Sequence, residues 1–188
     1  MLWLTSDMHL NHENMLGYAH RPFATVEELG VTLLHNINEH VTTNDTLWIL
    51  GDVCMGQEKS RRIATFLSQL VCRDVRLVRG NHDPKDIDAL LMAGFAEVCE
   101  LTDISLGNKQ RAMLCHYPML SWNRRQRGAL MLHGHIHSEG MAYNEENRRN
   151  GCLRYDVGVD ANGFCPVSAD ELKRFFSGVE PTDNPLRI

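Results

Sequence analysis

Residues 75–83 read Val-Arg-Leu-Val-Arg-Gly-Asn-His-Asp, and this stretch is the most informative about the fold of the chain. A short, largely apolar run is followed at once by a glycine and by three side chains that can bind a metal or transfer a proton, Asn81, His82 and Asp83. In open α/β sheets, ligands bind at the carboxyl ends of the strands. The stretch therefore predicts a buried strand that delivers polar side chains to a site.

The same arrangement recurs at four other places along the chain. Each place has a short apolar run that ends in Asp or His. A single Asp or His in this position would be unremarkable, because such residues often cap a helix or lie in a turn. Five endings at one edge of a sheet are difficult to explain by packing, so they predict a metal site. The predicted ligands are Asp7, His9, Asp52, Asn81, His116, His135 and His137.

The local spacing of the predicted ligands supports convergence on a small volume. Asp7 and His9 are two residues apart, as are His135 and His137, and in extended backbone such pairs point the same way. Glycines precede three ligands, where close approach or unusual backbone angles are needed. A ligand set of oxygen and imidazole nitrogen without thiolate suits Mn, Fe, Ni or Zn, and we rank Mn first.

Apolar patterning predicts a mixed α/β domain over residues 1–177, followed by a loosely ordered tail over 178–188. Nearly continuous apolar runs predict strands that are buried on both faces. These runs are Leu2–Leu4, Leu47–Leu50, Val75–Val78, Ala112–Cys115, Ala129–Leu132 and Tyr155–Val159. Apolar stripes or capping signals predict helices over 25–41, 59–70, from Pro84 to about Gly94, and after Ser168.

The composition limits the kinds of binding partner that we expect for this protein. The chain has 188 residues and a net charge of −5, which gives no reason to expect tight, non-specific binding to nucleic acid or to an anionic membrane. No apolar run reaches the length of a membrane span, and the first ten residues lack a signal peptide, so we expect a cytoplasmic protein without a membrane partner. Six scattered cysteines fit reduced, buried thiols.

The order of the motifs resembles the calcineurin-like metallophosphoesterase family, in its small bacterial and phage-type members. The motifs are Asp7-Met-His9, Gly51-Asp52, Gly80-Asn81-His82-Asp83, His116 and Gly134-His135-Ile136-His137. The resemblance implies an α/β/β/α sandwich of two mixed β-sheets flanked by helices. It also implies two divalent metal ions: the first on Asp7, His9 and His137, the second on Asn81, His116 and His135, with Asp52 bridging both.

The resemblance and the chemistry of two-metal sites together imply a mechanism. Two adjacent metals polarise phosphoryl oxygens and lower the pKa of a bound water, so that a metal-bound hydroxide attacks the phosphorus. His82 is expected to neutralise the phosphoryl group or to protonate the leaving oxygen. Asp83 is expected either to orient His82 or to cap the helix that begins at Pro84.

Several further side chains have two interpretations each. His12 is expected to face the substrate or to be an ordinary loop histidine. Arg21 is expected to clamp a phosphate oxygen or to be structural. His133 is expected to be a buried histidine at a strand end. The segment 122–127, with a Trp ring and three Arg side chains, fits nucleotide recognition or a charged surface loop.

The sequence thus predicts a dinuclear metal-dependent hydrolase of phosphomonoesters or phosphodiesters. The short chain leaves little room for a cap domain, which favours a small or nucleotide-like phosphate ester as substrate. One alternative is a catalytically silent scaffold or binding module of the same fold, although His82 and every ligand are present. Another is a nuclease on longer nucleic acid, which would need a local basic groove. The sequence leaves the oligomeric state open.

Overall fold

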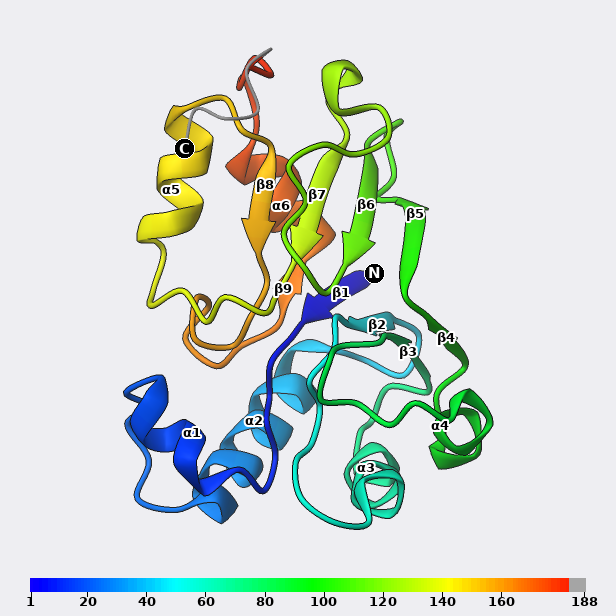
Figure 1. The fold of residues 1–188 in the computed structure, drawn as a ribbon. Helices are drawn as coiled ribbons and strands as arrows, with labels where there is room; N and C mark the ends of the chain where they lie inside the picture. Colours follow the sequence, from blue (N-terminus) through cyan, green and yellow to red (C-terminus); the bar gives the residue numbers. More distant parts are fainter. Residues whose placement is uncertain (183–188) are drawn as a thin grey trace.

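The structure is a computed structural model that describes residues 1–182. Its strands form two mixed sheets with helices around them (Figure 1). The first sheet has the order β4-β3-β2-β1-β9, in which only β9 is antiparallel to its neighbour. These strands are β1 (Leu2–Thr5), β2 (Thr46–Ile49), β3 (Asp74–Val78), β4 (Glu97–Cys99) and β9 (Val167–Ser168).

The second sheet has the order β5-β6-β7-β8, with β5 antiparallel to β6 and the other pairs parallel. Its strands are β5 (Leu101–Ser105), β6 (Arg111–Cys115), β7 (Leu130–His133) and β8 (Arg154–Asp156). A single parallel bridge between Ser6 and Gly158 joins the backbones that follow β1 and β8. This bridge ties the two sheets together at the ends where the predicted ligands lie.

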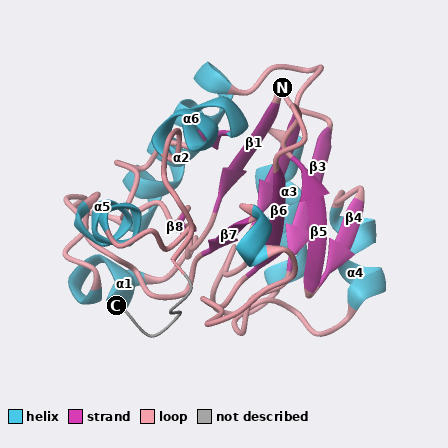
Figure 2. Cartoon of the chain, turned by 90° about the horizontal axis from the view of Figure 1, so that it is seen from above, coloured by secondary structure: helices cyan, strands magenta, loops and turns pink. Residues whose placement is uncertain are grey.

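Six α-helices and one short 3-10 helix, η1 (Arg125–Arg127), complete the part of the chain that the structure describes. The α-helices are α1 (Glu13–Tyr18), α2 (Val26–His40), α3 (Lys59–Ser68), α4 (Ile87–Ala93), α5 (Ala142–Arg149) and α6 (Ala169–Phe175). Helices α2, α3 and α4 lie on the side of the first sheet, and α5 lies beside β8 (Figure 1). Helix α6 contacts β9 and β1, and its Phe175 ring packs against Tyr155 of β8. Seen from above, α4 and α5 lie near opposite sides of the molecule (Figure 2).

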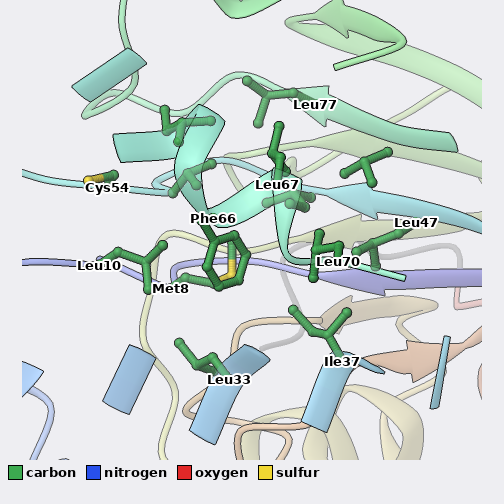
Figure 3. Packing of buried hydrophobic residues seen from close by; sticks show 14 of the residues in the cluster. Met8, Leu10, Leu33, Ile37, Leu47, Cys54, Phe66, Leu67, Leu70 and Leu77 are labelled. Carbon is green, nitrogen blue, oxygen red and sulfur yellow. The ribbon is translucent and has the colours of Figure 1, made fainter. Parts of the chain in front are cut away.

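Alternate residues of the central strands point into two different cores, which explains their nearly continuous apolar sequence. The first core lies between the first sheet and helices α2 and α3, and the second core lies between the two sheets and includes residues of α6. Leu47 and Ile49 of β2 pack with α2 and α3, whereas Trp48 packs between the sheets with residues of β6 and β7. Figure 3 shows Leu33 and Ile37 of α2 pointing into the first core. The predicted sandwich of two mixed sheets flanked by helices is confirmed.

Two local predictions near α4 are wrong, and two helices were not predicted. Helix α4 begins at Ile87, where the Asp86 side chain accepts the backbone N–H of Ala89, so the predicted start at Pro84 and the capping role of Asp83 are wrong. Helices α1 and α5 were not predicted, because neither has an apolar stripe. The buried residue of α1 is Met15, and those of α5 are Asn144 and Asn147.

The predicted tail divides into two parts. Within residues 178–182, Val179 packs against the second core, and the backbone of Thr182 bonds with Gly151 and with the side chain of Arg125. These contacts hold the segment against the domain. Residues 183–188 lie outside the described residues.

Candidate metal centre

The seven predicted ligands all follow the carboxyl ends of strands that lie side by side in the two sheets. Asp7 and His9 follow β1, Asp52 follows β2 and Asn81 follows β3 in the first sheet. His116 follows β6, and His135 and His137 follow β7 in the second sheet. Because both sheets end at the same edge, residues separated by up to 130 positions meet there.

The ligands form two groups, each with three donor atoms within 4.8 Å of one another. The first group is Asp7, His9 and His137, and the second is Asp52, His116 and His135. Asn81 joins the second group, since its Oδ1 lies 3.0 Å from Nε2 of His116. Asp52 lies between the groups: its Oδ2 is 3.5 Å from Nε2 of His9 and 3.5 Å from Nε2 of His116.

The buried donor atoms fit divalent cations. Oδ1 of Asp7 and Nε2 of His9 are buried without a hydrogen-bond partner, although such atoms are rarely left unsatisfied. Burial raises the pKa of Asp7 to about 7, because nearby histidines compensate only partly for the lost hydration. A bound cation would supply the missing partner and hold Asp7 ionised.

Hydrogen bonds orient the second group toward the same volume. Nδ1–H of His116 donates to the carbonyl oxygen of Leu50 at 2.7 Å, which leaves Nε2 free to bind a metal. Burial opposes ionisation of Asp52, but the neighbouring His116 and the backbone N–H of His82 outweigh burial and hold its pKa below the ordinary value. Asp52 is therefore an anion between the two groups.

Glycines allow the loops to approach this closely. Gly51 has a φ of +94°, in the left-handed region that glycine tolerates. Gly80 and Gly134 do not have positive φ angles. A Cβ at Gly80 would lie 2.3 Å from Oδ1 of Asp52, and one at Gly134 would lie 2.1 Å from Oδ2 of Asp7. Their contribution is the absence of a side chain.

Arg21 lies behind the first group, where a substrate cannot reach its fully buried guanidinium. The side chain donates to both carboxylate oxygens of Asp160, at 2.7 and 2.9 Å, and to the backbone oxygens of Asp7 and Met8. These four bonds engage all three nitrogens of the guanidinium. The geometry corresponds to the structural interpretation of Arg21, as a support for the ligand loop, and not to a phosphate clamp.

Asp160 is a residue of the site for which no role was predicted. Its Oδ2 accepts the Nδ1–H of His137 at 2.8 Å, so Nε2 of His137 is directed toward Asp7, 3.9 Å away. A carboxylate behind a metal-binding histidine fixes the ring and its tautomer. The signal in the sequence was that Asp160 lies in the segment 156–168, which resembles the C-terminal end of small bacterial and phage-type members of the family.

Asp83 supports the loop that carries Asp52. Its buried carboxylate accepts backbone N–H groups of Asp52, Val53 and Gly80 at 2.8–2.9 Å. No hydrogen bond between Asp83 and the ring of His82 occurs in residues 1–182. Asp83 thus positions a ligand through the backbone, which differs from both predicted roles.

His82 and His12 lie at the exposed side of the ligand groups. The side chain of His82 is 39% exposed, and its Nε2 lies 4.0 Å from Oδ2 of Asp52. Nδ1 of His12 lies 3.4 Å from Nδ1 of His9, and the rings of His12 and His82 are 6.5 Å apart. Both imidazoles are therefore close enough to the ligands to reach a bound substrate.

Two other side chains have structural roles. His133 is fully buried, with Nδ1 bonded to the carbonyl oxygen of Gly134 at 2.8 Å, as predicted. Trp122 is also buried, and its indole N–H donates to the carbonyl oxygen of Ala129. The Trp122 ring therefore does not offer a stacking surface for a base, which was one interpretation of segment 122–127.

Comparisons with known proteins assign the chain to a family. The family model for calcineurin-like phosphoesterases matches residues 1–161, so the chain belongs to this family. An uncharacterized protein of Methanocaldococcus jannaschii is 31% identical over 90% of this chain and 87% of its own length. The gene 66 protein of Mycobacterium phage L5 is 32% identical over 90% of this chain and 91% of its own.

A solved structure supports the fold. The crystal structure of a protein of unknown function from Aquifex aeolicus has a TM-score of 0.71 and 24% identity, covering 93% of this chain and 98% of its own. None of the helices in residues 1–182 has the length and apolar content that crossing a membrane requires.

Proposed function

We propose that this protein is a metal-dependent hydrolase of phosphomonoesters or phosphodiesters, acting on small or nucleotide-like substrates at a dinuclear centre. The observation that carries the proposal is the position of Asp52, whose Oδ2 is equally distant from a histidine of each ligand group. One carboxylate oxygen between two sets of donors suits a bridging ligand. Membership of the phosphoesterase family supports the same reaction class.

Two divalent ions fit the donor atoms. The first would be held by Asp7, His9 and His137, the second by Asn81, His116 and His135, with Asp52 shared. Manganese is our first choice for this oxygen and imidazole set, with iron, nickel or zinc as alternatives. When bound, such ions supply Lewis-acid activation of the phosphoryl group and of the attacking water.

The protein's own residues supply proton transfer and positioning. His82, which is partly exposed and 4.0 Å from Oδ2 of Asp52, is proposed to donate a proton to the leaving oxygen. His12, whose ring centroid lies 5.3 Å from that of His9 and 6.5 Å from that of His82, would contact the substrate beside His82. Arg21 and Asp160 hold the first ligand group in place through their ion pair.

The rival functions find less support. A silent scaffold would not need to retain His82 together with all seven ligands. A nuclease on long nucleic acid would need a basic groove beside the ligands, but the arginines of segment 124–127 precede β7, at the end of the strand opposite His135. The cytoplasmic location stays a prediction.

The proposal is tested with two simple substrates. We expect the manganese-loaded protein to hydrolyse p-nitrophenyl phosphate, bis-p-nitrophenyl phosphate or both, followed as release of p-nitrophenolate. The Asp52→Asn variant, purified in parallel, controls for contaminating phosphatases. A protein with both metals bound by elemental analysis that cleaves neither substrate would contradict the proposal.

A further inference from the structure

A cavity of about 550 Å³ lies beside the second ligand group. It is bordered by Asn81 on one side and by Cys115 and Tyr117, the neighbours of His116, on the other. Small-molecule sites commonly have volumes of about 300–1,000 Å³, which is far more than one phosphoryl group fills. The cavity therefore has room for the organic part of a phosphate ester.

The ring of Tyr117 is fixed beside the ligands and yet open to solvent. Its centroid lies 4.7 Å from that of His135 and 5.0 Å from that of His116, with interplanar angles of 68° and 74°. Edge-to-face contacts of this kind fix the plane of a ring. Because Tyr117 is still 45% exposed and lines the cavity, it offers a prearranged surface for a second ring.

The rest of the lining suits an apolar group. Leu101, 50% exposed, and Met119 border the cavity and would be covered by a bound ring. At the rim, Arg79 is paired with Glu100, whereas Lys85 has no ion-pair partner in the part of the chain that the structure describes. Since Asp83 and Glu100 also line the cavity, the two cations are balanced by two carboxylates, and the lining favours no particular charge on the organic group.

We propose that this cavity binds the organic part of the substrate and selects a flat aromatic group, such as a nucleobase, which packs on Tyr117. The proposal rests on the proposed function in one respect, namely that the phosphoryl group lies at the ligands Asn81 and His116. It adds the substrate class: esters of aromatic or nucleoside alcohols bind better than esters of alkyl alcohols or simple sugars.

The test is a binding measurement that does not depend on turnover. The ligands are the phosphonate analogues of adenosine monophosphate and ribose 5-phosphate, which differ in the base and cannot be hydrolysed. Isothermal titration calorimetry of the manganese-loaded protein should show roughly tenfold tighter binding of the adenosine analogue, as one stacked base provides. The Tyr117→Leu variant should reduce this preference to about twofold.

Two control variants make the result specific. Tyr117→Phe retains the ring and should retain the tenfold preference. Tyr18→Leu makes the same change as Tyr117→Leu at a tyrosine that is 74% exposed on α1, and should also retain it. Equal affinities in the parent protein, no binding of either ligand, or a preference that survives Tyr117→Leu would each overturn the proposal.

The two proposals fail in different ways. A protein that hydrolyses p-nitrophenyl esters but does not prefer the adenosine analogue contradicts the aromatic selection alone. A protein that prefers the adenosine analogue through Tyr117 but cleaves no ester contradicts the hydrolase proposal alone.

Discussion

Five of the seven proposed ligands have positive φ angles, between 48° and 74°. They are Asp7, His9, Asp52, His135 and His137. Left-handed backbone is unfavourable for residues other than glycine and persists only where the surroundings enforce it. Here, backbone bonds such as Asp7 N–H to the oxygen of Gly51 and His9 N–H to that of Asp52, at 3.0 Å each, fix the loops. The left-handed backbone at these five positions turns the loops so that the ligands converge on the site.

The proposed roles of His82 and Asp52 predict different losses. His82→Ala should lower kcat on bis-p-nitrophenyl phosphate by about 10²–10⁴-fold, the usual contribution of a general acid, while metal content is retained. Asp52→Asn should lose both activity and bound metal, because the shared anion is removed. Elemental analysis of both variants beside the parent protein is the measurement. A metal-free His82→Ala protein would show that His82 holds the site together instead.

The contact between Asp160 and His137 predicts weaker metal binding in Asp160→Asn. The substitution removes the charge that fixes the Nδ1–H of His137 and pairs with Arg21, so affinity for manganese should fall by about 10–100-fold. Competition with a fluorescent chelator measures the affinity. Asp170→Asn makes the same change on the surface of α6 and should bind manganese normally. Equal affinities in the two variants would contradict the role of Asp160.

At the scale of helices and strands, the elements that position the site are short and depend on their ends. Strands β1, β2 and β7 have four residues each, and the ligands lie in the loops directly beyond them. Parallel pairing of β1 with β2, and of β6 with β7, brings these loops together. Since β9 pairs with β1 at the edge and runs directly into α6, the start of α6 also fixes the edge of the first sheet.

The capping box of α6 is expected to contribute to stability. The Ser168 side chain accepts the N–H of Glu171, whose carboxylate in turn accepts the backbone N–H of Ser168. Ser168→Ala should lower the free energy of unfolding by about 0.5–2 kcal/mol, the usual cost of losing an N-cap. Urea denaturation measures the change, with the exposed Ser177→Ala as control. A loss below that of the control would show that the box does not stabilise α6.

For the whole molecule, each ligand group draws residues from both sheets. Asp7 and His137 come from different sheets, as do Asp52 and His116. A bound metal would therefore link the two layers in addition to the core between them. Binding that occurs only in the folded state stabilises that state by mass action.

Metal removal is expected to destabilise the protein. At a free manganese concentration of 100 times Kd, each independent site should add about 2.7 kcal/mol to the free energy of unfolding. Differential scanning calorimetry with manganese and with EDTA measures the shift. Asp52→Asn should show a much smaller difference between the two conditions. An identical melting temperature for the parent protein in both conditions would argue against a metal that spans the sheets.

The sequence by itself determined six of the nine strands and four of the six α-helices in the described residues, together with the set of proposed ligands. Apolar periodicity is a local property, so buried runs such as Val75–Val78 and stripes such as that of α2 are visible without neighbours. The position of a polar residue directly after a strand is local too. For this reason Asp7, Asp52 and His116 could be assigned to one edge of a sheet, and the family motifs then divided the ligands between two metals.

Only the tertiary structure decided the roles of the residues behind and beside the ligands. Arg21 and Asp160 are 139 positions apart, and their ion pair exists because β1 and β8 meet at the joined edge of the two sheets. Asp83 accepts backbone N–H groups from the loop that follows β2. Tyr117 lines a cavity to which residues beyond both sheets contribute. Such contacts depend on which segments the fold brings together, and an isolated charged or aromatic residue carries no signal of its distant partner.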